Sequence, residues 1–428
     1  MSGGLFAAAM HGLIRLFYPQ MPVSHRERLP AHGPGIVVAN HPNGLLDPLV
    51  LRVALGLPLR FLGKSTFWGS PVTRFAMNQL EVLPAYRAHE ADARKNEETF
   101  ARCRDHLRAG GWLALFPEGK SHSETTLQPL KTGAARIALS ALAEGVTDLK
   151  IVPVGLLYAD KAVFRTTAGV VVGEPLRARD WGEAHAADPR AAAQALTEQV
   201  GAALGEVVLQ ADDAELMRGL SAVAAWTAAD GGQDEAARDR RALALAAAAR
   251  RLATEAPERL DAAVTETRRF VGVMEALGVD DPFSVEAPRP ARLVGGGLKL
   301  LALAPFALVG AALAWAPYRA VRPLAARLAA GETDVVGTYK LVLGLGALAL
   351  TYTAWAIAAA CLWGPLAGLA AVVVGPLTGL AAVRFDDHLT RRARALKGWW
   401  RSRDADVVTA VHDARRAVCA AVEAALEA

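Results

Sequence analysis

Cysteine is scarce in this chain, and its cysteines are widely separated. The 428 residues contain three, Cys103, Cys361 and Cys419, and Cys361 lies within an apolar run. They are too few for a disulfide-rich scaffold, and their spacing does not suit a metal cluster. The pattern therefore favours a reducing compartment.

Charge is absent from two long segments, Leu300–Tyr318 and Leu341–Val383. A helix through the second segment would be roughly twice as long as the ~30 Å hydrocarbon layer of a membrane. We therefore expect it to cross a membrane, reverse near Gly364-Pro365 and return as a helical hairpin. Leu300–Tyr318 contains Pro305 and is only just long enough to cross, so it either adds a third span or lies in the interface.

The net charge of +4 is small, and no basic stretch is interleaved with aromatic residues as in a nucleic-acid-binding module. Basic residues gather instead directly after the last apolar run, as Arg384, Arg391, Arg392, Arg394, Lys397 and Arg401. Such a cluster is a positive-inside signal and would suit anionic lipid head groups, although a solvated helix face has the same composition. With two spans, this basic cluster and the N-terminal half of the chain would lie on the same side of the membrane. This agrees better with the positive-inside tendency, so we favour two spans over three.

The N-terminal segment Leu5–Met21 is apolar, but it contains His11 and Arg15 and has no small-residue cleavage site. A signal peptide would have an uninterrupted apolar centre and such a site. We interpret residues 1–28 as an amphipathic helix on a membrane surface.

Short apolar runs alternate with helix-like segments between residues 29 and 185. The predicted strands are Ile36–Val38, Leu59–Leu62, Leu80–Leu83, Trp112–Phe116 and Ile151–Leu157, and the predicted helices between them include Pro71–Met77, Asp92–Arg108 and Thr132–Ala143. This alternation predicts an α/β domain with a mostly parallel sheet flanked by helices on both faces. We expect a charged helical region and linker at 186–290, followed by membrane helices and a basic tail at 291–428.

The clearest chemistry flanks a turn in Asn40–Pro48. His41 follows the strand Ile36–Val38, and Asp47 stands where a helix is expected to begin. In open α/β sheets, ligands bind at the carboxyl ends of strands. An imidazole there can take a proton from an alcohol while a carboxylate orients it. The alternative, that His41 only caps the turn and Asp47 only caps the helix, stays open at this point.

Two further segments follow later strands, Pro84–Arg87 and Phe116–Ser123, and a third motif, Val152–Val154, lies within the last predicted strand. Lys64, Arg87 and Lys120 would bring positive charge to the same edge as His41, and Gly119 would let the backbone approach a ligand, which suits a phosphate. Glu118 and His122 would share one face of a helix and could hold a metal ion. The preceding strand and Gly119 favour a loop instead, so we expect no metal.

These motifs, in this order, resemble those of the glycerophospholipid acyltransferase family, which carries Asn-His…Asp, Arg, Phe-Pro-Glu-Gly and Val-Pro blocks. The resemblance extends over residues 34–173. Asn40–Pro48, Phe116–His122 and Pro129–Gly133 look most like the branch that acylates glycerol 3-phosphate or dihydroxyacetone phosphate. Two features depart from the family pattern. Five residues separate His41 from Asp47 where four are usual, and Lys120 replaces the usual Thr-Arg.

The resemblance implies that His41 removes the proton of the acceptor hydroxyl while Asp47 orients the imidazole. The hydroxyl oxygen would then attack the thioester of acyl-CoA or acyl carrier protein, with no metal or other cofactor. Phosphate and glycerol backbone would be held by Arg87, Glu118, Gly119, Lys120 and Ser121, with positive charge from Lys64. Pro153 would shape the side that receives the acyl chain.

Together these features lead us to expect an integral membrane glycerol-3-phosphate O-acyltransferase of phospholipid synthesis, dependent on acyl-CoA. It would lie in the cytoplasmic membrane if bacterial, with its catalytic domain facing the cytoplasm. One alternative keeps the chemistry but acylates 1-acylglycerol 3-phosphate. Another is a non-catalytic lipid-binding membrane protein of the same fold, against which the intact His41 and Asp47 argue.

Overall fold

A computed structural model describes residues 4–86, 93–211, 214–227, 234–279, 282–285 and 290–427. The chain divides into two compact units. The first unit consists of Met1–Ala224, Gln233–Ala247 and Glu332–Gly337. The second consists of Ala225–Gly232, Ala248–Gly331 and Thr338–Ala428.

An eight-stranded sheet forms the centre of the first unit, in the order β1-β7-β6-β2-β5-β3-β4 with β8 paired to β6. The strands are β1 Val23–Ser24, β2 Gly35–Ala39, β3 Leu59–Lys64, β4 Leu83–Ala85, β5 Trp112–Leu115, β6 Lys150–Tyr158, β7 Ala168–Val172 and β8 Leu176–Arg177. The five adjacent strands from β6 to β4 are parallel, whereas β7 and β8 run antiparallel to β6. The predicted mostly parallel sheet is confirmed.

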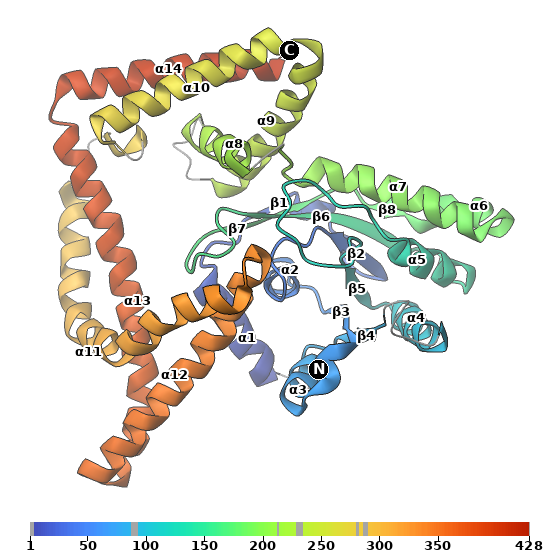
Figure 1. Cartoon of the computed structure of the whole chain (residues 1–428), viewed down its shortest axis with the longest axis horizontal. Coiled ribbons are helices and arrows are strands. Elements are labelled where there is room, and N and C mark those ends of the chain that lie inside the picture. The colour runs from blue at the N-terminus through green and yellow to red at the C-terminus, as the bar shows by residue number, and fades with distance from the viewer. Residues whose placement is uncertain are drawn as a thin grey trace. The chain divides into compact units, whose positions relative to one another are not determined.

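Helices precede, separate and follow these strands along the chain (Figure 1). They are α1 Gly4–Phe17, α2 Leu46–Leu55, α3 Pro71–Gln79, α4 Ala93–Arg108, α5 Gly133–Ala143, α6 Gly182–Ala187, α7 Pro189–Val207, and the larger parts of α8 Ala214–Trp226 and α9 Glu235–Glu255. Short 3₁₀ turns occupy Arg26–Arg28, Ser65–Gly69 and Ala178–Trp181. The predicted N-terminal helix is thus present as α1. Its last turn buries Ile14 and Phe17.

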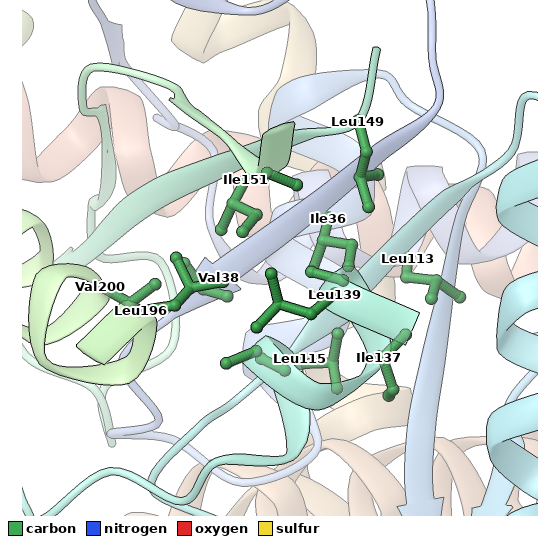
Figure 2. Close-up of a cluster of buried hydrophobic side chains, with 14 of the residues drawn as sticks. Ile36, Val38, Leu113, Leu115, Ile137, Leu139, Leu149, Ile151, Leu196 and Val200 are labelled. Atoms are coloured by element: carbon green, nitrogen blue, oxygen red, sulfur yellow. The ribbon is translucent and has the colours of Figure 1, made fainter. Parts of the chain in front are cut away.

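One buried cluster lies between the sheet and helices α5 and α7 (Figure 2). Ile36 and Val38 of β2 enter it together with Ile137 and Leu139 of α5 and Leu196 of α7. Because successive side chains of a strand point to opposite faces, the buried Val37, Ala114 and Val152 belong to the other face. Both faces of the sheet are therefore covered, as the sequence predicts.

The chain departs from the predicted elements around residue 80. A strand was expected at Leu80–Leu83, but α3 continues to Gln79 and the strand β4 spans Leu83–Ala85. Leu80 still donates its backbone N–H to Ala76, and Glu81 takes a left-handed conformation with φ of 54°. The apolar run is therefore divided between a helix end, a turn and a strand.

The first unit also continues beyond residue 185, where the sequence suggested that the α/β domain ends. Helix α7 buries Leu196, Val200 and Leu204 in the same cluster as the central strands. Its amphipathic pattern therefore serves the core of the α/β unit.

The second unit contains long helices: α10 Pro257–Leu277, α11 Pro290–Ala329, most of α12 Thr333–Trp363, α13 Pro365–Arg401 and α14 Ala405–Glu427, with a 3₁₀ turn at Pro282–Val285. Helix α11 packs along α13, and α10 packs along α14 (Figure 1). Between α12 and α13 stands only Gly364, with φ of 90°. The predicted reversal at Gly364-Pro365 is confirmed.

Three segments, Lys299–Ala329, Thr333–Trp363 and Pro365–Ala393, are long and apolar enough to cross a membrane by length and composition. Leu350, Trp363 and Leu366 on these helices are 75%, 75% and 81% exposed. Large apolar surfaces of this kind are normally covered by lipid or by another protein. The helices support membrane association. Because α11 also meets the length and composition of a span, three spans fit the structure as well as two.

Candidate active site

His41 and Asp47 meet at the carboxyl end of β2. The His41 Nδ1 atom lies 2.8 Å from Asp47 Oδ2, and the Asp47 side chain is fully buried. Asp47 is the second residue of α2, whose N-cap is Leu45 and has no side-chain capping bond. The turn between the two residues passes through Gly44 in a left-handed conformation, with φ of 46°. This turn accommodates the five-residue spacing.

Three donors surround the Asp47 carboxylate. The backbone N–H of Asn43 donates to Oδ2 at 2.7 Å, and the Tyr158 hydroxyl donates to Oδ1 at 2.7 Å. Burial and the charge of Asp47 raise the pKa of Tyr158, so its hydroxyl stays protonated and remains a donor. Since an ionised carboxylate can only accept, His41 Nδ1 carries the proton of that contact, and Nε2 is left as the basic nitrogen.

A second layer of hydrogen bonds fixes the turn itself. The Asn43 side-chain amide donates to the Tyr18 hydroxyl at 2.7 Å and to the backbone carbonyl of Lys161 at 3.0 Å. The Tyr18 hydroxyl donates to the same carbonyl at 3.1 Å. Tyr18 is fully buried, and burial raises its pKa. The turn between His41 and Asp47 is thus held by the residue that follows α1 and by the loop after β6.

The His41 ring is also held by stacking. It lies nearly parallel to the Phe116 ring, with the centroids 4.0 Å apart and the planes 11° apart. Phe116 follows β5 directly, so two neighbouring strands place the two rings. The stack and the Asp47 contact leave the His41 ring little rotational freedom.

Glu118 joins the Phe116–Ser123 loop to the backbone of His41. Its Oε1 accepts the His41 N–H at 2.9 Å, and its Oε2 accepts the Gln128 N–H at 2.8 Å and contacts His122 Nε2. The His122 N–H in turn donates to the His41 carbonyl at 3.1 Å. The Glu118 side chain is fully buried, and both of its oxygens are occupied within the protein. Its predicted role in substrate binding therefore stays a prediction, whereas its bonding to the loop and to His41 is observed.

Asn40 connects the start of the turn to β6. Its side-chain amide donates to the Leu156 carbonyl at 3.1 Å and accepts the Leu156 N–H at 2.7 Å. This pair continues the β2–β6 ladder one residue beyond Ala39. The start of the His41–Asp47 turn is consequently bonded to the sheet.

The predicted cationic residues Lys64, Lys120 and Arg87 differ in exposure, and only the first two are among the described residues. Lys64 ends β3 and is half-buried, and Lys120 is exposed on the loop after β5. Both follow parallel strands, so they lie toward the same edge of the sheet as His41. Arg87 lies outside the described residues. Lys131, which was not among the predicted site residues, brings its ammonium 2.4 Å from where a Cβ of Gly119 would stand.

The predicted site residues Gly119, Ser121 and Pro153 differ in their exposure to solvent. Gly119 is exposed with φ of 75°, and Ser121 beside it is half-buried. Pro153 is buried within β6, where its carbonyl accepts the Gly173 N–H at 2.8 Å. The Gly119 turn can thus approach a ligand, and Pro153 acts from inside the sheet.

Sequence reasoning missed several residues that hold the pair in place. Tyr18, Asn43, Tyr158 and the Lys161 carbonyl all contribute hydrogen bonds to the turn or to Asp47. Tyr158 offers a signal that could have been read, because it follows the predicted strand directly and therefore belongs to the ligand-binding edge. Tyr18 offers none, since its place depends on how α1 packs.

Comparison with known proteins finds similarities over the region that contains this site. Residues 20–157 match the acyltransferase family. A 120-residue stretch is 37% identical to glycerol-3-phosphate O-acyltransferase 2 of Saccharomyces cerevisiae, over 28% of this chain and 16% of that protein. Another of 146 residues is 30% identical to a chloroplastic 1-acyl-sn-glycerol-3-phosphate acyltransferase of Brassica napus, over 34% of this chain and 39% of that protein. The chain spans well under half the length of these relatives.

Among solved structures, the chain is similar to the 1-acyl-sn-glycerophosphate acyltransferase of Thermotoga maritima. The TM-score is 0.35 and the identity 16%, over 47% of this chain and 78% of that chain. The sequence matches agree on acyltransferases of glycerolipids and divide between the two acceptors that the relatives' names give.

Proposed function

We propose that this protein is a membrane-associated glycerolipid acyltransferase whose acceptor is glycerol 3-phosphate. The observation that carries the proposal is the His41–Asp47 pair, 2.8 Å apart, at the carboxyl edge of an acyltransferase-type sheet. Within the described residues no hydrogen bond occupies His41 Nε2, so this nitrogen is available to an acceptor hydroxyl.

In this mechanism, His41 Nε2 takes the proton of the acceptor hydroxyl as the oxygen attacks the thioester carbonyl. The new C–O bond forms, the C–S bond breaks, and the proton passes to the departing thiolate. Asp47 stabilises the imidazolium that exists between the two transfers. General-base assistance of this kind typically contributes about 100- to 10,000-fold to the rate.

The acceptor phosphate would be held by positive charge near the Gly119 turn. Lys120 and Lys131 are on this loop, Lys64 is at the end of β3, and Arg87 follows β4 in the sequence. Ser121 would donate a hydroxyl to the phosphate or glycerol backbone. Lysine gives point charge without the bidentate geometry of arginine, so this site would tolerate differences in phosphate orientation.

The acyl donor would be acyl-CoA, with acyl carrier protein as the other thioester of the same chemistry. Pro153 would shape the side that receives the acyl chain. If the protein is bacterial, it would lie in the cytoplasmic membrane with its catalytic domain facing the cytoplasm. The basic residues after Val383 would then suit anionic lipid head groups.

Acylation of 1-acylglycerol 3-phosphate is a second candidate, because a relative of that name matches over a longer stretch than the yeast enzyme. Both acceptors present a hydroxyl and a phosphate, and they differ in the acyl chain that the site must also admit. Dihydroxyacetone phosphate is the third acceptor of this set.

The test is an acceptor panel with the purified full chain in detergent–lipid micelles. Acyl-CoA is supplied with glycerol 3-phosphate, dihydroxyacetone phosphate or 1-acylglycerol 3-phosphate, and the acylated products and the released thiol are measured. We expect saturable transfer to glycerol 3-phosphate that His41→Ala lowers by about 100-fold or more. Saturation only with 1-acylglycerol 3-phosphate would favour the second candidate, and no transfer to any of the three would refute an acyltransferase role.

A further inference from the structure

The first turn of α12 packs against the catalytic turn. Residues Glu332–Gly337 cluster with the α/β unit, although α12 continues beyond them as a candidate membrane span. A Cβ at Gly337 would stand 2.7 Å from Leu46 Cδ1, 2.8 Å from Asn43 Oδ1 and 3.0 Å from the Lys161 carbonyl oxygen. At distances this short, the position can hold the Cα hydrogen of glycine but not a side-chain carbon unless a neighbouring group moves. We call Thr333–Gly337 the α12 foot.

Polar contacts hold the α12 foot at this place. The Lys161 ammonium donates to the Pro42 carbonyl at 3.0 Å and to the Ser123 hydroxyl at 3.0 Å. The Ser123 hydroxyl is hydrogen-bonded to that of Thr333. Asp334 is only 7% exposed, and its charge acts on Lys161. Lys161 therefore joins the catalytic turn, the Phe116–Ser123 loop and the α12 foot.

Asn43 connects this packing to the catalytic pair. It is fully buried, its backbone N–H donates to Asp47, and its side-chain amide bonds Tyr18 and Lys161. Its Oδ1 atom is buried without a hydrogen-bond partner among the described residues and faces Gly337. A displacement of the α12 foot would expose Asn43 to water, which would compete for the bonds that hold the turn.

We propose that the α12 foot is a positioning element of the active site, acting through Asn43 and Lys161 on His41 and Asp47. The apolar C-terminal helices would then be needed for turnover itself as well as for attachment to a membrane. The inference rests on the proposed acyl transfer. A misplacement of about 1 Å at a reacting group can cost about 100-fold in rate, so a small shift of the turn is sufficient.

The first experiment replaces Gly337 by alanine in the full chain and measures kcat and KM for the acceptor that the wild type uses. The added methyl group must displace Leu46, Asn43 or the backbone at Lys161, and we expect kcat to fall about 10- to 100-fold with KM changed less than about 3-fold. Gly344→Ala is the matched control, because Gly344 lies in the same helix with open space around its Cβ position. We expect its kinetics to equal those of the wild type.

A Gly337→Ala variant that keeps the wild-type kcat would overturn the inference. An inactive wild type would instead refute the proposed function, so the two failures are distinguishable. Thermal unfolding is measured in parallel on both alanine variants, to separate a shift of the turn from loss of the fold.

The second experiment substitutes Lys161, whose ammonium bonds to Pro42 and Ser123. Replacing it by methionine removes these bonds without adding bulk. Lys161→Met should lower kcat about 10-fold, and Lys161→Arg should restore much of it, because a guanidinium can donate to both Pro42 and Ser123. In a Gly337→Ala background, Lys161→Met should cost less than about 3-fold, because the contact is already disturbed. Full additivity of the two substitutions, or equal loss with methionine and arginine, would contradict the coupling.

Discussion

Two imidazole–carboxylate pairs lie at the same edge of the sheet, and they are built differently. His41 contacts Asp47 through Nδ1, and His122 contacts Glu118 through Nε2. Both carboxylates are fully buried, and the two histidine side chains are 17% and 11% exposed. Carboxylate contact and burial of the ring alone therefore do not separate a reactive histidine from a supporting one.

The separation comes from the second ring nitrogen. His122 Nδ1 is buried without a hydrogen-bond partner in the described part of the chain, so no substrate reaches it. His41 Nε2 is not among the buried unpartnered atoms there. This difference supports the proposal that His41 is the base and that His122 supports the loop. Glu118 connects the loop to His41 directly, because it accepts the backbone N–H of His41.

The largest expected effect is that of His41→Ala. Removing the base should lower kcat by about 100- to 10,000-fold, the usual contribution of general-base catalysis, with KM for the acceptor nearly unchanged. Steady-state thioester cleavage measures it, and a melting curve checks the fold. If His122→Ala cost as much with the fold intact, the distinction between the pairs would fail.

Tyr158→Phe should have the next largest effect. It removes one donor from Asp47 Oδ1 and leaves a buried carboxylate oxygen without that bond. A lost bond to a charged group is worth about 1.5–3 kcal/mol, so we expect kcat to fall about 10- to 100-fold. Tyr318→Phe is the matched control, because Tyr318 lies on α11 and is 76% exposed. An unchanged kcat for Tyr158→Phe would contradict the role of Tyr158 as a donor.

Glu118→Gln tests whether Glu118 supports the loop or holds the substrate. The amide cannot accept from all of the His41, Gln128 and His122 donors, so we expect a loss of about 1–3 kcal/mol in the free energy of unfolding. The fall in kcat should be about 3- to 10-fold. A rise in KM for the acceptor without loss of stability would instead favour direct contact with the substrate.

The smallest effect on activity is expected from His122→Gln. A glutamine amide can still donate to Glu118, so kcat should stay within about 3-fold of the wild type. A loss of kcat of about 100-fold or more in this variant, with the fold intact, would assign the base to His122.

The sequence predicts the reactive pair better than it predicts the groups that support it. Ile36–Val38 and Ile151–Leu157 form strands because their apolar residues are buried on both faces, and the turn after the first strand places His41 as expected. Contacts such as Tyr18–Asn43 depend on segments that meet only after folding, and local pattern does not contain them. The motif around Glu118 likewise gives no sign of its bonds to the His41 backbone and to His122, which join residues that meet only in the folded chain.

The Asn40 side-chain amide makes two hydrogen bonds to the backbone of Leu156, and these make the register of β2 and β6 independent of the length of the turn that follows. It gives Leu156 the donor and acceptor that a further residue of β2 would have supplied, so β6 stays paired where β2 turns away. Residues can then be inserted between His41 and Asp47 without shifting any strand. The five-residue turn of this chain is longer by one residue than the usual pattern, and the Asn40 bonds leave the pairing of β2 and β6 independent of its length.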